Sequence, residues 1–255
     1  MRTTAVIAAL LLASLAAPAG AQRAADKPLR VLSSNGIRAA LEKLVPDAER
    51  AAGRRIAIRF SSSTALKQSI DKGEAFDVAI LTPEIIEELT RAGTVRAGTR
   101  TDLASIDLAV GVRAGSPKTD ISTPDAMRRR LAAARSLTWT EGGAASTANL
   151  AMIEALGLRE QLASRIVVQR VPGVASETVA RGEHELVLLP LSEIQGVAGV
   201  EVLGLLPAPF QRPVVMTAGI AAHTRAPETA AALVAFLSGP HAAPVLIAAG
   251  MKPAR

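Results

Sequence analysis

The strongest constraint on the fold is the alternation of short apolar runs with longer amphipathic stretches along most of the chain. The apolar runs favour strands, and most of them are followed by a helical pattern. This order is typical of α/β proteins with mostly parallel sheets, since a helix carries the chain from one strand to the next. The predicted strands are residues 29–33, 56–60, 77–81, 107–113, 136–140, 165–170, 185–189 and 214–221.

The first predicted helix follows the first strand. It carries four apolar residues at spacings of three and four: Ile37, Leu41, Leu44 and Ala48. These positions form one stripe, which we expect to face the core. Pro46 lies within the stripe, and we expect it to kink or end the helix because proline has no N–H.

Two stretches that contain glycine or proline are expected to divide the chain into two lobes. Residues 113–117 follow an apolar strand and contain Gly115 and Pro117, and residues 205–213 contain three prolines. We expect the chain to cross between lobes at both places, with the crossings acting as a hinge. The predicted division is residues 22–112 for the first part of lobe 1, residues 113–206 for lobe 2, and residues 207–255 for the return to lobe 1.

Residues 1–21 have the pattern of a cleavable signal peptide. Arg2 is followed by an apolar run over residues 5–17 and by small residues up to Ala21. The run is shorter than the roughly 20 residues that span a bilayer. With no cysteine in the chain, neither a lipid anchor at the cleavage point nor a disulfide can form. We therefore expect an exported protein, cleaved near Ala21 and released.

Charge and composition restrict the ligand. The formal net charge is +6, which favours anionic partners, but the basic residues are scattered and aromatic residues make up 2%. Nucleic acid binding needs clustered charge and stacking surfaces, so no nucleic acid partner is expected. The three histidines stand apart in the sequence, and no cysteine joins them. We expect neither a metal site nor a cofactor.

Small hydroxyl-bearing residues follow the first two predicted strands. Ser33, Ser34 and Gly36 lie in one loop, and Ser62 and Ser63 lie in the other. In doubly wound sheets ligands bind at the carboxyl ends of strands, where helix amino termini offer free N–H groups. These loops therefore predict donors to a small anion. The alternative is that the serines are ordinary helix caps.

Two loops of the predicted second lobe could add backbone donors. Ala145 and Ser146 lie in a run of small residues before a predicted helix, where backbone amides can approach a ligand closely. Gly173 and Val174 lie between a later strand and helix, where a plain turn with a helix cap is the alternative. Four donor loops facing one cleft would hold a small anion.

Enzyme motifs are absent from the sequence. It contains no G-x-S-x-G, G-x-x-x-x-G-K-[ST] or G-x-G-x-x-G pattern. Thr64 and Lys67 have the spacing of a serine–lysine nucleophile pair, but the first residue is threonine. We therefore expect a binding protein rather than an enzyme, with an exported hydrolase as a less favoured alternative.

Several stretches resemble the molybdate-binding proteins of ABC transporters, a family of periplasmic solute-binding proteins. The likeness covers nearly all of the mature chain and is carried by RVLSSNGIRAALEKL, RFSSSTALKQSIDKGEAFDVAILTPEIIEEL, VASETVARGEHELVLL and LVAFLSGPHAAPVLIAAGMKP. The resemblance implies the type II periplasmic binding protein fold, with two α/β lobes joined by two crossover strands. It also implies a tetrahedral oxyanion in the cleft and delivery to a membrane permease.

Some family ligand positions match this sequence and others depart from it. Ser63 matches a ligand serine, and Ala145 or Ser146 falls where the family uses a backbone amide. Gly36 stands where the family has a serine, Pro190 falls near a ligand tyrosine, and Pro172 falls near an amide position although it has no N–H. Gly173 or Val174 would have to replace that amide.

The resemblance and the donor loops together predict a monomeric periplasmic solute-binding protein. Its expected ligand is molybdate, tungstate or a similar small oxyanion, and its expected partner is an ABC transporter permease. A solute-binding protein for a small organic acid is the alternative, because the missing serine and tyrosine hydroxyls permit another anion.

Overall fold

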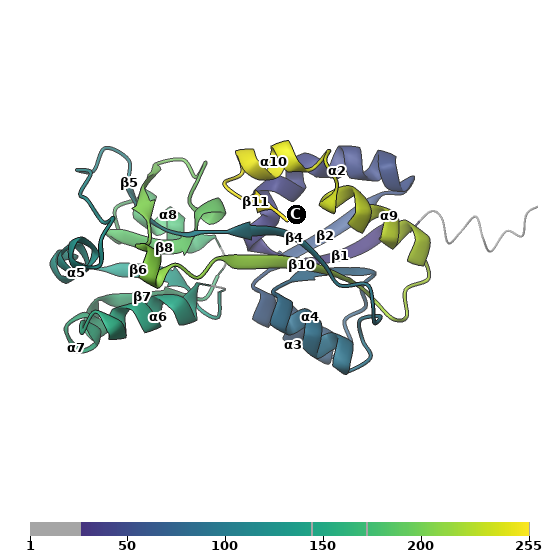
Figure 1. Ribbon diagram of the computed structural model, residues 1–255, viewed down its shortest axis with the longest axis horizontal. Helices are drawn as coiled ribbons and strands as arrows, with labels where there is room; N and C mark the ends of the chain where they lie inside the picture. The colour runs from purple at the N-terminus through teal and green to yellow at the C-terminus, as the bar shows by residue number, and fades with distance from the viewer. Residues whose placement is uncertain (1–26, 144, 172, 255) are drawn as a thin grey trace, which may run out of the picture.

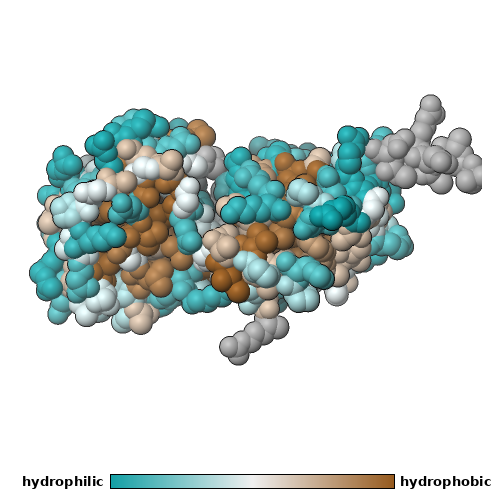
Figure 2. Space-filling model, turned by 90° about the horizontal axis from the view of Figure 1, so that it is seen from above, coloured by the Kyte–Doolittle hydropathy of each residue, from teal (hydrophilic) through white to brown (hydrophobic). Residues whose placement is uncertain are grey.

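The computed structural model describes residues 27–143, 145–171 and 173–254, which form two α/β lobes side by side (Figure 1). Seen from above, the two lobes again lie side by side (Figure 2). The predicted signal peptide and Pro172 lie outside the described residues. Within the described part, no helix is both long and apolar enough to cross a membrane.

Lobe 1 contains a mixed sheet in the order β11-β4-β10-β3-β1-β2. Strand β1 is parallel to both of its neighbours, β3 and the edge strand β2. Strand β10 is antiparallel to both of its neighbours, β3 and β4. The antiparallel strand is the one that returns from lobe 2. The strands are β1 (Leu29–Ser34), β2 (Ile56–Ser61), β3 (Val78–Leu81), β4 (Thr101–Ile106), β10 (Val214–Ile220) and β11 (Lys252–Pro253).

Helices cover both faces of this sheet (Figure 1). One face carries α2 (Arg38–Ala52), α9 (Pro227–Ser238) and α10 (Ala243–Ala248), and the other carries α3 (Ser63–Asp71) and α4 (Pro83–Arg91). A short 3-10 helix, η1 (Asn35–Ile37), joins β1 to α2. The predicted apolar stripe of α2 is buried, because Ile37, Leu41, Leu44 and Ala48 are each at most 3% exposed.

Pro46 does not end α2, so of the two predicted effects, a kink or an end of the helix, the second is wrong. The helix continues from Pro46 to Ala52, where Gly53 in the left-handed conformation terminates it. Pro46 is exposed, so solvent can reach the Glu42 carbonyl that has lost its N–H partner. Loss of one helical hydrogen bond is tolerated on the wet face of a helix whose other face is packed.

Lobe 2 contains a second mixed sheet in the order β7-β6-β8-β5-β9. Strand β6 is parallel to β7 and β8, and β5 is antiparallel to β8 and β9. The strands are β5 (Leu108–Arg113), β6 (Leu137–Thr140), β7 (Ile166–Gln169), β8 (Leu186–Pro190) and β9 (Val200–Leu205). The helices are α5 (Pro124–Ala133), α6 (Ser146–Ala155), α7 (Arg159–Leu162), α8 (Val174–Ala180), η2 (Ala163–Arg165) and η3 (Leu191–Glu193).

The first crossing between lobes lies earlier than residues 113–117, where the sequence predicted it. Strand β4 belongs to the sheet of lobe 1 and β5 to the sheet of lobe 2, so the chain crosses at Asp107. The crossing is a single extended residue with no glycine or proline to mark it. The apolar core also continues across it through Ile106 and Leu108, so hydropathy gives no signal there.

The return crossing occupies the stretch between β9 and β10, including the 3-10 helix η4 (Ala208–Phe210). Gln211 ties this stretch to the first crossing: its Oε1 accepts from the Leu108 N–H at 2.7 Å, and its Nε2 donates to the Leu108 carbonyl at 3.0 Å. Lys252 Nζ lies 2.6 Å from Asp107 Oδ2 at the same place. The two crossings are therefore tied to each other at the junction of the lobes.

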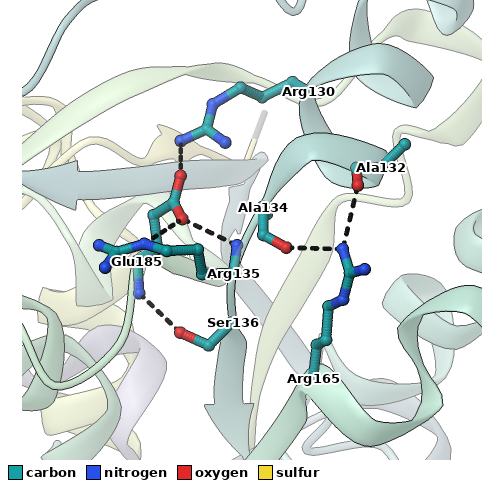
Figure 3. A network of polar contacts seen from close by, with 7 residues as sticks. All are labelled: Arg130, Ala132, Ala134, Arg135, Ser136, Arg165 and Glu185. Atoms are coloured by element: carbon teal, nitrogen blue, oxygen red, sulfur yellow. Dashed lines mark hydrogen bonds and ion pairs between the residues drawn. The ribbon is translucent and has the colours of Figure 1, made fainter.

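One carboxylate braces each lobe; Asp77 is buried and Glu185 is half-buried. Asp77 accepts from the Arg30 N–H and from the Thr224 hydroxyl, both at 2.8 Å. In lobe 2 Glu185 accepts from Arg130 at 2.9 Å and from the Arg135 N–H at 2.8 Å (Figure 3). Burial by itself raises the pKa of each carboxyl. The hydrogen bonds and nearby arginines lower the pKa by more than burial raises it, so the pKa of each group lies below its ordinary value.

Candidate anion-binding site

A pocket lies between the two lobes, at the carboxyl ends of strands from both sheets. The space enclosed between its walls is about 10 Å³, and the space that includes the open mouth is about 320 Å³. Residues of β1, β6 and β8 reach it directly, and the first turn of α3 reaches it after β2, as expected for a ligand site of this sheet type. The lining residues are Ser34, Asn35, Ser62, Ser63, Thr140, Gly143, Ala145, Leu189, Pro190 and Glu193.

The wall from lobe 1 is built on the amino terminus of α3. Ser62 caps this helix, since its Oγ accepts from the Ala65 N–H at 3.2 Å. Ser63 is the first helical residue and is 5% exposed. Its Oγ has no hydrogen-bond partner among the described residues. Ser62 is thus an ordinary helix cap, which was the alternative role that the sequence left open for these serines. Ser63 instead presents a free hydroxyl at the pocket.

The first serine loop is only partly in the pocket. Ser34 and Asn35 line it, with the Ser34 Oγ accepting from the Gly36 N–H at 3.4 Å. Ser33 is fully buried and donates to the Ser34 carbonyl at 3.2 Å, so it lies behind the pocket. Gly36 is also absent from the lining; a Cβ there would lie 3.4 Å from Met216 Cε, so the glycine permits close packing on β10.

The wall from lobe 2 centres on the end of β6. Thr140 is 4% exposed, and its Oγ1 has no hydrogen-bond partner among the described residues. Ala145, the amino-terminal cap of α6, also lines the pocket. Ser146 does not: its Oγ donates to the Thr140 carbonyl at 2.9 Å, and its N–H donates to the Gly143 carbonyl at 3.0 Å. Ser146 therefore shapes the loop that positions Thr140.

The second donor loop of lobe 2 does not reach the pocket. Neither Gly173 nor Val174 is a lining residue, and the Val174 N–H donates to the Val171 carbonyl at 3.3 Å. Gly173 has φ of +87° and caps α8 without a side-chain hydrogen bond. This geometry is that of the plain turn with a helix cap, the alternative that the sequence left open.

The sequence did not single out two side chains of the pocket, Thr140 and Glu193. Thr140 is the last residue of β6, so the rule that ligands bind at strand carboxyl ends could have pointed to it. Glu193 lies in η3, three residues after β8, in a stretch with no recognisable motif. Burial raises the pKa of the Glu193 carboxyl to about 7.

The lobes touch on two sides of the pocket. Ser192 Oγ donates to the Gly36 carbonyl at 2.6 Å, a buried contact between η3 and η1. Thr64 Oγ1 donates to the Gly142 carbonyl at 3.2 Å, an exposed contact between α3 and the loop before α6. These two contacts hold the walls against each other.

The electrostatics of the pocket depend on helix termini rather than on cations. Helices α3 and α6 come from opposite lobes, and their amino termini meet at the lining. Each contributes the positive end of a helix dipole. Asn149 fixes α6 on β8 by donating to the Leu188 carbonyl at 3.0 Å. No lysine, arginine or histidine is among the described lining residues, so neutral donors would hold an anion here.

The hydrolase alternative finds little support in this geometry. Lys67 pairs with Asp71 at 2.8 Å, and the hydrogen bond that Lys67 donates to this carboxylate raises the lysine pKa, which is the wrong direction for a general base. The Thr64 hydroxyl is engaged with Gly142. The described residues also contain no cluster of three or more His, Cys, Asp or Glu that could hold a metal ion.

Comparison with known proteins identifies the family. Residues 29–252 match the family described as bacterial extracellular solute-binding protein. The chain belongs to this family. An aconitate isomerase from Pseudomonas sp is 29% identical over 230 residues, which are 88% of this chain and 87% of that protein. The resemblance to solute-binding proteins that the sequence predicted is thus confirmed.

Solved structures confirm the two-lobed fold of this solute-binding protein. The periplasmic molybdate-binding protein of Azotobacter vinelandii has a TM-score of 0.74 at 24% identity, over 89% of this chain and 100% of that one. The sulfate-binding protein of Mycobacterium tuberculosis has a TM-score of 0.71 at 15% identity, over 89% and 87%. The predicted α/β fold of periplasmic binding proteins is therefore correct, with mixed rather than mostly parallel sheets.

Proposed function

We propose that this chain is the exported solute-binding component of an ABC transporter and captures a small anion between its lobes. The observation that carries the proposal is the pair of free hydroxyls, Ser63 Oγ and Thr140 Oγ1, which reach one pocket from opposite lobes. A ligand that accepts from both would join the lobes. The proposal includes the periplasm as the location and a permease as the partner.

The energetics of these hydroxyls favour an anion. A buried polar group without a partner costs about 1–3 kcal/mol, and a hydrogen bond to a charged group contributes about 1.5–3 kcal/mol. An anion accepts from both hydroxyls and interacts favourably with the two helix amino termini. A neutral apolar ligand would leave both hydroxyls unpaired.

Two classes of anion fit this proposal. Molybdate, tungstate or another tetrahedral oxyanion is the class that the sequence predicted, and solved relatives named for molybdate and sulfate support it. A small carboxylate is the alternative, supported by the relative named aconitate isomerase. The chain contains no tyrosine to supply a further hydroxyl donor.

A thermal-shift and calorimetric screen tests the proposal. The panel is molybdate, tungstate, sulfate, succinate, malate and cis-aconitate. We expect at least one anion to raise the melting temperature and to bind with a stoichiometry of one. Ser63→Ala should abolish or strongly weaken this response, while Ser69→Ala, on the same helix but outside the pocket, should leave it unchanged. No response from wild type to any anion would contradict the proposal.

The second candidate function is isomerisation of a small unsaturated carboxylate. It is favoured by Glu193, a half-buried pocket residue whose carboxyl pKa, raised by burial to about 7, suits proton transfer at neutral pH. Incubation with cis-aconitate followed by NMR would detect the trans isomer. Turnover that is lost in Glu193→Gln would support this function over simple binding, whereas cis-aconitate that binds and stays unchanged would exclude it for this substrate.

A further inference from the structure

Glu193 is the one ionisable side chain among the described residues that line the pocket. All other lining side chains are neutral, and two of them present free hydroxyls. A carboxylate in a pocket built for an anion is a conflict, because two negative charges repel strongly where little water screens them. A proton shared between the Glu193 carboxyl and the bound anion would remove this repulsion.

The backbone around Glu193 is fixed on both sides. Its own carbonyl accepts from Ser176 Oγ of α8 at 2.9 Å, and the preceding Ser192 donates to the Gly36 carbonyl of the opposite lobe at 2.6 Å. The Glu193 carboxyl itself pairs with no cation or hydrogen-bond donor among the described residues. The backbone that carries this carboxyl is therefore fixed, and the carboxyl has no partner of its own among the described residues.

The charged groups of the neighbouring elements do not resolve the conflict. Helix η3 packs against η1, which has no titratable residue, and against β5, whose Arg113 lies at the far end of the strand. On α8, Glu177 pairs with Arg181. Burial is the cause of the raised Glu193 pKa, so this carboxyl can take up a proton near neutral pH.

We propose that Glu193 determines the specificity of the pocket by sharing one proton with the bound anion, an inference that rests on the proposed anion-binding function. An anion with a hydroxyl group brings that proton itself and donates to the ionised carboxylate. A fully ionised tetrahedral anion has no proton to give, so its binding protonates Glu193 from solvent. The pocket therefore favours hydroxy acids over such anions as the pH rises.

The experiment measures affinity by calorimetry at about pH 6 and about pH 8 for molybdate, sulfate and malate. Molybdate and sulfate carry no proton in this range, whereas malate carries a hydroxyl. We expect wild type to bind molybdate and sulfate about tenfold more weakly at the higher pH, since protonation of Glu193 becomes unfavourable there. Malate should change much less.

Variants separate Glu193 from other titrating groups, including the three histidines. Glu193→Gln has the same shape and no titrating proton, so its affinity for molybdate and sulfate should be nearly independent of pH. Glu177→Gln, an acid on α8 outside the pocket, should keep the pH dependence of wild type. If wild type binds malate but not the tetrahedral anions, Glu193→Gln should acquire their binding, and its failure to do so would contradict the inference.

Other results would overturn the inference directly. Affinities of wild type for molybdate and sulfate that are equal at the two pH values would show that no proton is shared. The same pH dependence in Glu193→Gln as in wild type would place the proton elsewhere. Absence of binding to every anion at both pH values would instead contradict the proposed function, because the inference concerns only how a bound anion is selected.

Discussion

The two walls of the pocket are built in different ways. Lobe 1 presents Ser63 from the first turn of a helix, directly after a parallel strand and beside a serine cap. Lobe 2 presents Thr140 from the end of a strand and Glu193 from a 3-10 helix. The first wall contributes neutral donors alone, and the second adds an acid. The difference suggests that lobe 1 supplies general anion affinity and lobe 2 supplies selectivity.

The largest expected effect is the loss of anion affinity when the free hydroxyl of either wall is removed. Ser63→Ala and Thr140→Val should each weaken binding of the preferred anion about tenfold to a hundredfold, the worth of a hydrogen bond to a charged group. Neither should lower the stability of the ligand-free protein, because neither hydroxyl has a partner to lose. Calorimetric titration and chemical denaturation measure the two quantities.

Thr138→Val is the matched control on the same strand. Thr138 is fully buried, but its Oγ1 donates to the Val167 carbonyl at 2.7 Å on β7. This variant should lose stability, by about 1 kcal/mol, and keep its anion affinity. If Thr140→Val behaves like Thr138→Val, then Thr140 has a structural role and lobe 2 does not contribute a hydroxyl to the ligand.

A second comparison concerns the two carboxylates that brace the lobes. Asp77→Asn and Glu185→Gln should each destabilise the protein at neutral pH by about 1–3 kcal/mol, with the larger effect for Asp77, whose side chain is 10% exposed against 24% for Glu185. Both folded-state pKa values are lowered. The stability from each group is therefore complete above the ordinary carboxyl pKa of about 4 and is lost as the pH falls through the lowered value.

Denaturant unfolding at about pH 7 and about pH 3.5 measures this effect. Wild type should lose stability between the two pH values, and each variant should lose less, since it has one carboxylate fewer to protonate. Equal losses in wild type and in Asp77→Asn would mean that this carboxylate does not link folding to pH.

The smallest expected effects concern the contacts between the lobes. Ser192→Ala removes a buried bond to Gly36, and Thr64→Val removes an exposed bond to Gly142. We expect Ser192→Ala to weaken anion affinity about threefold to tenfold and Thr64→Val less than threefold, because exposed bonds exchange readily with water. Calorimetry with the preferred anion measures both. Equal effects would indicate that burial does not distinguish the two contacts.

Much of the fold was predictable from the sequence because strands and amphipathic helices alternate regularly. The strand beginning at Ile56 and the helix that carries Leu41 and Leu44 in its apolar stripe lie where the pattern placed them. Strands β4 and β9 were not predicted; β9, for example, is only half buried, and Glu201 and Gly204 interrupt its aliphatic residues. The crossing at Asp107 escaped prediction because an extended chain passes between sheets there without a turn.

The candidate site was predictable in lobe 1 and much less so in lobe 2. A run of serines between a parallel strand and a helix predicts hydrogen-bond donors at a ligand site, and Ser63 lines the pocket as this pattern predicted. Gly173 and Val174 also lie between a parallel strand and a helix, but the Val174 N–H is engaged within its own turn. Thr140 and Glu193 meet Ser63 only through the packing of one lobe on the other, which no local pattern contains.

The central claim is that one anion binds between the two lobes. The most direct measurement is a crystal structure of the protein grown with the anion that gives the largest thermal shift. The account predicts that the anion lies within hydrogen-bond distance of both Ser63 Oγ and Thr140 Oγ1. An anion bound instead beside Arg129, Arg130 and Arg135 on the outer surface of lobe 2, with the interlobe pocket unchanged, would contradict it.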